Sequence, residues 1–278
     1  MTPRELIRIT AEQYRAAGIP DPENDAALLL THLTGRPALE LRLDADSETD
    51  PAVMAAYQDF VQKRLKRIPL QYLLGEASFF RRVFRVDPRV LIPRPETELL
   101  CEWALEVIRD MPSPQVLDLC CGSGCIGLTI KAERSDAVVT LSDISADALN
   151  VAAANAARLS IDVSVCQSDL LEAFPRSSFD LIISNPPYIP SAECDRLQPE
   201  VMREPRLALD GGTDGCNICR RIIQTAGYTL VAGGKLLMEL GIHESGVISS
   251  YLSAYDYSGI EIRKDYAGID RMILAVFP

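Results

Sequence analysis

The chain has 278 residues, of which 47% are hydrophobic, and it carries a formal net charge of −11. This length exceeds what one average domain needs, so we expect two domains, each with its own core. The acidic balance excludes a broad phosphate-binding surface, because nucleic-acid affinity depends largely on Lys and Arg. No apolar run approaches the roughly 18 residues that span a bilayer. We therefore expect neither a stable nucleic-acid partner nor a membrane.

The cysteines and the start of the chain indicate the compartment. The first residues have no basic region followed by an apolar stretch, so we expect no secretion signal. Eight cysteines in such a chain favour the reducing cytoplasm, where thiols remain free. Cys216 and Cys219 have CxxC spacing, but no second pair or nearby His completes a metal set. The sequence therefore predicts no metal.

Residues 1–70 have the apolar spacing of helices and form the expected N-terminal domain. Asp21 followed by Pro22 predicts an N-cap and a first helical residue. A later helix is expected at 51–67. This region contains no nucleophile, metal cluster or glycine-rich loop, so we interpret it as a domain that docks the substrate.

The hydrophobic period shifts towards two between residues 71 and 90, which predicts a linker β-hairpin. The remaining residues, 91–278, alternate strand-like and helical runs. Such alternation builds an α/β fold with a mostly parallel sheet and helices on both faces. The expected strands are 116–120, 138–142, 163–166, 181–184 and 236–240, with a terminal antiparallel pair at 260–264 and 272–277; the expected helices are 96–109, 126–133, 146–158 and 216–230.

A loop of small residues follows the first strand of this domain and precedes a helix. It comprises Cys120, Cys121, Gly122, Ser123 and Gly124. Small side chains let backbone amides approach a ligand closely. Cys120 occupies the first glycine position of the dinucleotide-binding pattern, so the loop is a poor match to a pyrophosphate site. We expect it to bind a different nucleoside-containing cofactor.

Acidic residues recur near the ends of three successive expected strands. Asp118 could meet a cationic amino group, and Asp143 could accept hydrogen bonds from both hydroxyls of a ribose. Asp169 could receive an adenine amino group, and Leu170 could cover the ring. Each acid alone could equally be a cap or a turn residue. Their recurrence favours a common S-adenosylmethionine site.

The run 179–188 places Asn185, Pro186, Pro187 and Tyr188 directly after a buried strand. The prolines stiffen the loop and remove two amide donors. Two hydrogen bonds, accepted by the Asn185 side chain and the Pro186 carbonyl, would hold an NH2 group whose lone pair is delocalised. Tyr188 could stack on the planar group. These residues predict methyl transfer to an amide or base nitrogen, without a general base acting before attack.

Other segments resemble the release factor glutamine N5-methyltransferase family, also called PrmC or HemK. The resemblance rests on Asn185–Tyr188 together with the runs 71–75, 90–98, 204–215 and 264–271. It implies a seven-stranded, mostly parallel, Rossmann-like methyltransferase sheet with a small all-α N-terminal domain joined by a β-hairpin. It also implies methylation of the glutamine in the Gly-Gly-Gln motif of class 1 peptide-chain release factors.

The same resemblance implies that residues 185–188 bind the glutamine, while residues 120–124 and Asp143 bind the S-adenosylmethionine donor. Residues 94–97 would lie near the cofactor entrance or shape the glutamine pocket. Cys120 and Cys121 stand where Gly and Thr are common in the family, and Leu170 stands where some members carry an aromatic residue. We expect altered cofactor affinity rather than lost function.

Two alternatives remain at this stage. One is a methyltransferase that modifies the amino group of DNA adenine or rRNA guanine. The other is a non-catalytic protein that binds S-adenosylmethionine. His32 and His243 are expected to be helix-face residues without a catalytic role.

Overall fold

The computed structural model describes residues 1–278 and divides into two compact units. Residues 1–76 and 198–203 form the helical unit, and residues 77–197 and 204–278 form the sheet unit. The expected hairpin at 71–90 is therefore divided: its first residues belong to the helical unit and the rest to the sheet unit. No helix is long and apolar enough to cross a bilayer.

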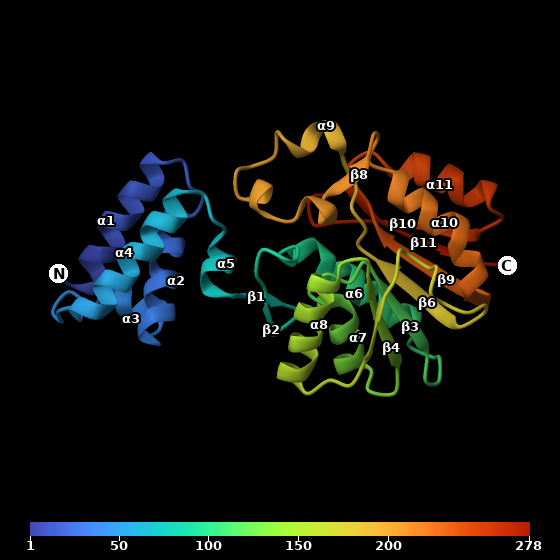
Figure 1. Ribbon diagram of the computed structural model, residues 1–278, viewed down its shortest axis with the longest axis horizontal. Helices are drawn as coiled ribbons and strands as arrows, with labels where there is room; N and C mark the ends of the chain where they lie inside the picture. The colour runs from blue at the N-terminus through green and yellow to red at the C-terminus, as the bar shows by residue number, and fades with distance from the viewer. The chain divides into compact units, whose positions relative to one another are not determined.

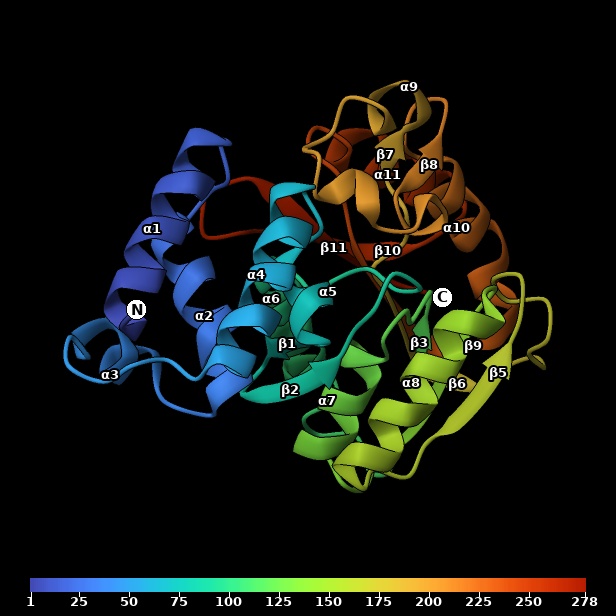
Figure 2. The same cartoon turned by 60° about the vertical axis from the view of Figure 1, so that its left-hand side comes forward.

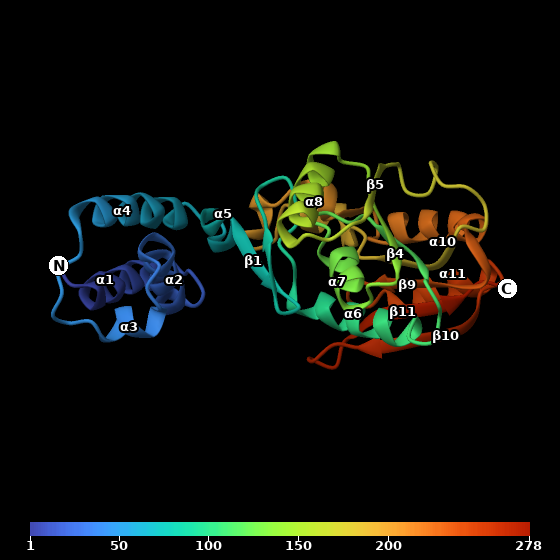
Figure 3. The ribbon, with the colours of Figure 1, turned by 90° about the horizontal axis from the view of Figure 1, so that it is seen from below.

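The helical unit is built from α1 (Pro3–Ala16), α2 (Pro22–Thr34), α3 (Ala38–Leu43), α4 (Pro51–Leu65) and α5 (Leu70–Leu74). The second helix, α2, contacts both α1 and α4 (Figure 3). The sequence predicted α2 and α4, but the short helices α3 and α5 were not expected. Asp21 is the N-cap of α2 and Pro22 its first residue, as predicted, although Asp21 has φ 50° and its side chain makes no capping hydrogen bond.

A buried ion-pair cluster joins the segment 198–203 to the rest of the helical unit. Arg64 on α4 is almost fully buried, and its guanidinium lies 2.7 Å from both Asp25 and Glu200. Glu200 also pairs with Arg67 at 2.8 Å. Buried charges are stable only when they are paired, so Arg64 holds a distant part of the chain in the helical core.

We expect Arg64→Ala to destabilise the helical unit by about 3–5 kcal/mol, because it leaves the buried Asp25 carboxylate without its cation and Glu200 with Arg67 alone. Hydrogen exchange of α2 and α4 in the full chain measures this change. Arg8→Ala is the matched control, since Arg8 pairs with Glu12 on the solvent-exposed face of α1, where such pairs contribute little. Equal protection in the two variants would contradict the assigned role.

The sheet unit begins with a hairpin of β1 (Glu76–Phe79) and β2 (Arg82–Arg85). A seven-stranded sheet follows, in the order β10-β11-β9-β6-β3-β4-β5. Its strands are β3 (Gln115–Leu119), β4 (Val138–Asp143), β5 (Ser164–Gln167), β6 (Phe179–Ser184), β9 (Leu230–Glu239), β10 (Ser258–Lys264) and β11 (Asp270–Val276). β11 is antiparallel to both of its neighbours. The mostly parallel sheet and its terminal antiparallel pair are thus confirmed.

Helices cover both faces of this sheet, as Figure 1 shows. The helices α6 (Pro95–Val107), α7 (Cys125–Glu133) and α8 (Ala146–Leu159) pack on one face, and α10 (Asn217–Thr229) and α11 (Ser245–Ala254) on the other. Successive residues of a strand point to opposite faces. Leu181 and Ile183 accordingly enter the first core, while Ile182 enters the second.

A small accessory sheet lies in the connection between β6 and α10. It pairs β7 (Ile189–Pro190) with β8 (Asp210–Gly212), and α9 (Ser191–Cys194) contacts both strands (Figure 2). Neither these strands nor α11 were expected from the sequence. The expectation for His243 was wrong, because this residue lies in the turn before α11 with φ 71°.

Candidate functional site

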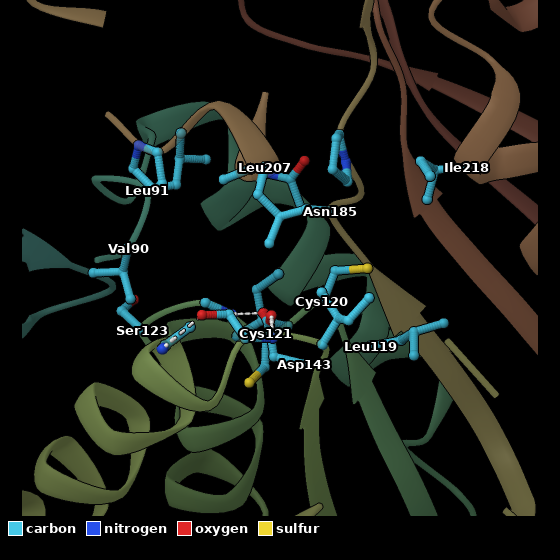
Figure 4. A pocket seen from close by; sticks show the side chains of 18 of the residues that line it. Val90, Leu91, Leu119, Cys120, Cys121, Ser123, Asp143, Asn185, Leu207 and Ile218 are labelled. Atoms are coloured by element: carbon cyan, nitrogen blue, oxygen red, sulfur yellow. Dashed lines mark hydrogen bonds between the residues drawn. The ribbon is translucent and has the colours of Figure 1, made fainter. Parts of the chain in front are cut away.

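A cavity lies beyond the carboxyl ends of β3, β4 and β6, where ligands bind in sheets of this kind. Its volume of about 230 Å³ is many times that needed for one water molecule, so it can hold an organic ligand. Figure 4 shows Asn185 and Leu207 across the cavity from Asp143 and the loop after β3. The predicted site residues that line it are Cys120, Cys121, Gly122, Ser123, Asp143, Asp169, Leu170, Asn185 and Pro187.

Four predicted residues do not line the cavity: Asp118, Gly124, Pro186 and Tyr188. Gly124 supports the loop from beneath, since an added Cβ would lie 3.2 Å from side-chain carbons of Ala152, Leu128 and Leu141. The opposite holds for Gly122, where nothing lies within 4 Å of an added Cβ. The loop is thus tightly packed on its inner side and open at Gly122.

Asp143 closes β4 and orders this loop. One carboxylate oxygen accepts a hydrogen bond from the Gly122 amide and the other from the Ser145 amide, each at 2.9 Å. Burial raises the pKa of Asp143, and these two hydrogen bonds oppose the rise. Each carboxylate oxygen has a second lone pair, so Asp143 can still accept hydrogen bonds from a ligand in the cavity.

Asp118 lies fully buried beneath the loop. Its Oδ2 accepts the Gly127 amide at 2.8 Å near the start of α7, whereas its Oδ1 has no hydrogen-bond partner. Burial raises the pKa of this carboxyl to about 7, and the nearby Asp143 contributes to the rise. A buried acceptor without a donor is unusual, and it is the feature that a cationic ligand group could relieve.

Asp169 and Leu170 follow β5 and form another part of the cavity wall. Asp169 pairs with Arg221 of α10 at 3.0 Å. Leu170 has φ 49° and is buried. A backbone conformation that an L-residue adopts rarely often marks a functional position. Here it places an apolar side chain on the cavity wall.

The loop after β6 is held by hydrogen bonds from inside the sheet unit. The Asn185 Nδ2 donates to Thr97 Oγ1 at 3.2 Å, and the Thr97 hydroxyl donates to Glu239 at 2.7 Å. The Tyr188 hydroxyl donates to the other oxygen of Glu239 at 3.2 Å. Arg271 lies over the Tyr188 ring, 5.8 Å from its centroid. Tyr188 is therefore engaged with β9 and β11.

Gly211 packs directly against the backbone of this loop. An added Cβ would lie 2.7 Å from the Tyr188 Cα and 2.8 Å from the Pro187 carbonyl oxygen, and it would also meet the Gly215 carbonyl. These are backbone atoms that cannot rotate away. Gly211, in the middle of β8, therefore fixes the position of residues 187–188.

A second carboxylate, Glu204, joins two chain segments at the rim of the cavity. It accepts hydrogen bonds from the Ile92 amide at 2.9 Å and from the Arg94 guanidinium. Both segments contribute cavity-lining residues, namely Arg94 on one side and Pro205 and Leu207 on the other. The rim is thus formed by parts of the chain that are distant in sequence.

The sequence reasoning missed Glu239, and it placed Thr97 only generally near the site. Glu239 ends the buried strand β9, just as Asp143 ends β4. The same rule, an acid at the end of an apolar strand, could have identified it. Gly211 appeared only within a segment of resemblance, because its close approach to the loop is not visible in the sequence.

No group of three or more His, Cys, Asp and Glu side chains is arranged to hold a metal ion. Cys216 and Cys219, which have CxxC spacing, are buried in the apolar core beneath α10. Burial raises the pKa of both thiols, which makes them less reactive at neutral pH.

Solved structures define the class to which this fold belongs. A methyltransferase from Pyrococcus furiosus is similar with a TM-score of 0.55 at 17% identity, covering 77% of this chain and 98% of that chain. The Thermus thermophilus 16S rRNA N2 G1207 methyltransferase RsmC, solved with AdoMet and guanosine, also gives 0.55 at 19% identity, covering 73% of this chain and 50% of that one. The fold is that of a methyltransferase.

Sequence comparisons show the family. Residues 97–212 match the model of the methyltransferase small domain, and residues 5–75 match that of the PrmC N-terminal domain. The release factor glutamine methyltransferase of Deinococcus radiodurans is 38% identical over 98% of this chain and 97% of its own length; that of Chlorobaculum tepidum is 38% identical over 96% and 94%. The chain therefore belongs to the release factor glutamine methyltransferase family.

We expect Gly211→Ala to displace the Pro187–Tyr188 backbone. Overpacking of this kind destabilises by about 1–3 kcal/mol, and misplacement of a site by 1 Å can slow catalysis by on the order of 100-fold. Thermal unfolding and methyl-transfer rates measure both effects. Gly246→Ala is the matched control, because nothing lies within 4 Å of an added Cβ there. Wild-type activity in Gly211→Ala would contradict the supporting role.

Asp118 gives the protein a specific pH dependence. The folded chain holds a proton on this carboxyl up to about pH 7, whereas the unfolded chain releases it near 3.8. The free energy of unfolding therefore falls as the pH rises through this window. We expect Asp118→Asn, which keeps an acceptor for Gly127 and carries no charge, to raise Tm more at pH 8 than at pH 5.

Thermal unfolding without ligand at both pH values provides the measurement. Asp162→Asn, at an exposed position, is the control. An equal change in Tm at the two pH values would show that the charge of Asp118 is not what the variant removes.

Proposed function

We propose that this protein transfers a methyl group from S-adenosylmethionine to the side-chain amide nitrogen of the glutamine in the Gly-Gly-Gln motif of class 1 peptide-chain release factors. The observation that carries the proposal is the placement of the Asn185 amide across one cavity from Asp143 and the Cys120–Ser123 loop. One wall then serves the donor and the other serves the acceptor nitrogen. Membership of the release factor glutamine methyltransferase family supports the substrate.

Several residues fit S-adenosylmethionine, the methyl donor. Gly122 is open towards the ligand side, Asp143 retains lone pairs for the ribose hydroxyls, and Leu170 provides an apolar wall for the adenine. The unpartnered Oδ1 of Asp118 fits the cationic amino group of the donor through a bridging water, since its side chain lies behind the loop. When bound, S-adenosylmethionine supplies an electrophilic methyl group and leaves as S-adenosylhomocysteine.

The chain's own residues position the acceptor nitrogen. An amide nitrogen is a poor nucleophile, because its lone pair is delocalised into the carbonyl. The Asn185 carbonyl oxygen accepts one hydrogen bond of the glutamine NH2, and the backbone carbonyl of Pro186, which stands between the cavity-lining Asn185 and Pro187, accepts the other. Together they hold the nitrogen lone pair towards the methyl carbon. As the new N–C bond forms, the C–S bond breaks and sulfur takes its electron pair. The nitrogen then loses a proton, so no base must act first.

The helical unit is the proposed docking domain for the release factor. Its residues 5–75 match the PrmC N-terminal domain model, and it contributes no residue to the cavity. We further propose a cytoplasmic site of action, which agrees with eight cysteines that are all free thiols.

We expect Asn185→Ala to fold and to bind S-adenosylhomocysteine with near-wild-type affinity, but to lose about 100-fold or more in methyl transfer, because two aligned contacts are reduced to one. Tritiated methyl transfer to a purified release factor measures the rate, with total DNA and rRNA assayed in parallel. A release factor with the glutamine of its Gly-Gly-Gln motif replaced by alanine is the substrate control. Transfer to nucleic acid alone, or near-normal turnover by the variant, would refute the proposal.

A further inference from the structure

The side chain of Asn185 forms one end of a buried chain of hydrogen bonds. Its Nδ2 donates to Thr97 Oγ1 at 3.2 Å, and Thr97 is only 2% exposed. The Thr97 hydroxyl donates to Glu239 Oε2 at 2.7 Å, and Glu239 is only 1% exposed. Three elements are involved: the loop after β6, the first turn of α6 and the end of β9. None of them is adjacent to another in sequence.

The donor-to-acceptor direction of these hydrogen bonds follows from counting protons. A hydroxyl has one proton to donate, whereas an ionised carboxylate only accepts. Thr97 gives its proton to Glu239, so its oxygen can only accept a hydrogen bond from Asn185. The Asn185 amide must therefore turn its NH2 towards Thr97, and its carbonyl oxygen is left at the opposite end.

Two further neighbours of Glu239 favour its ionised, accepting form. It receives a second hydrogen bond from the Tyr188 hydroxyl at 3.2 Å, and Arg271 contributes a positive charge nearby. Burial raises the pKa of Glu239, and these donors and Arg271 oppose the rise. If Glu239 were protonated and donated to Thr97, the Thr97 hydroxyl would donate to Asn185 instead. The Asn185 carbonyl oxygen would then face Thr97, and its NH2 would face the cavity.

We propose that Thr97 and Glu239 are positioning residues that orient the Asn185 amide so that its carbonyl oxygen, and not its NH2, faces the substrate nitrogen. The inference rests on the function proposed above. An amide has nearly the same shape in its two orientations, so packing alone selects weakly between them. In the wrong orientation, one NH2 group would face another and the acceptor for the glutamine would be lost.

The test compares two substitutions of Thr97 in the full chain. Thr97→Val has nearly the same shape but cannot accept a hydrogen bond, and an unpaired NH2 then has reason to turn towards the cavity. We expect kcat for methyl transfer to fall about 10-fold to 100-fold, with unchanged binding of S-adenosylhomocysteine. Thr97→Ser retains the hydroxyl and is expected to keep most of the activity. Thr225→Val, at an exposed position on α10, is the control for the effect of a Thr-to-Val substitution away from the site.

Repeating the Thr97 substitution in an Asn185→Asp variant separates the orientation of the side chain at position 185 from the packing around Thr97. In Asn185→Asp both ends of the side chain are acceptors, so orientation no longer matters. We expect Thr97→Val to lower kcat with Asn185 present and to have little further effect combined with Asn185→Asp. An equal loss in both backgrounds, or equal losses for Thr97→Val and Thr97→Ser, would overturn the inference. If Asn185→Asp has no activity, the two Thr97 variants decide by themselves.

These outcomes are distinct from failure of the proposed function. If the wild-type protein transfers no methyl group to a release factor, the function is refuted. If the wild type is active and Thr97→Val is equally active, only the positioning inference is refuted.

Discussion

Glu239 is a carboxylate buried at the end of a central strand, and this single group constrains much of the sheet unit. A buried acceptor is stable only when donors reach it. The donors come from Thr97 at the start of α6 and from Tyr188 in the loop after β6. The position of β9 is therefore coupled to two segments that belong to the cavity region. Gly211 acts on the same loop from the other side, through backbone contact rather than charge.

On the other side of the cavity, the loop after β3 is organised by two further buried carboxylates, Asp143 and Asp118. Asp143 accepts two backbone amides and so fixes the loop after β3, while Asp118 remains half satisfied beneath it. The first carboxylate gives shape to the wall. The second has one oxygen, Oδ1, without a hydrogen-bond donor inside the protein, and a bound ligand could supply that donor. A fully hydrogen-bonded carboxylate and a partly hydrogen-bonded one thus lie on the neighbouring strands β4 and β3.

Much of the sheet and half of the site could be predicted from the sequence, because their signals are local. Strand–loop–helix alternation identified β3, β4, β6 and α7, and acids near strand ends identified Asp143. The accessory strands β7 and β8 were not predicted, because they are short and pair across a long connection. The interaction of Thr97 with Glu239 joins residues 142 positions apart. No local pattern encodes such a partner, although each residue alone carries a hint.

The segment 198–203 has a consequence for how the protein is made. It belongs to the helical unit through Arg64 and Arg67, although it is encoded far downstream of α1–α5. During vectorial synthesis on a ribosome, the N-terminal helices emerge early but cannot complete their core until this piece of the later domain has followed them. The helical unit is therefore completed only after most of the sheet unit has been made, and no single proteolytic cut can release the helical unit intact.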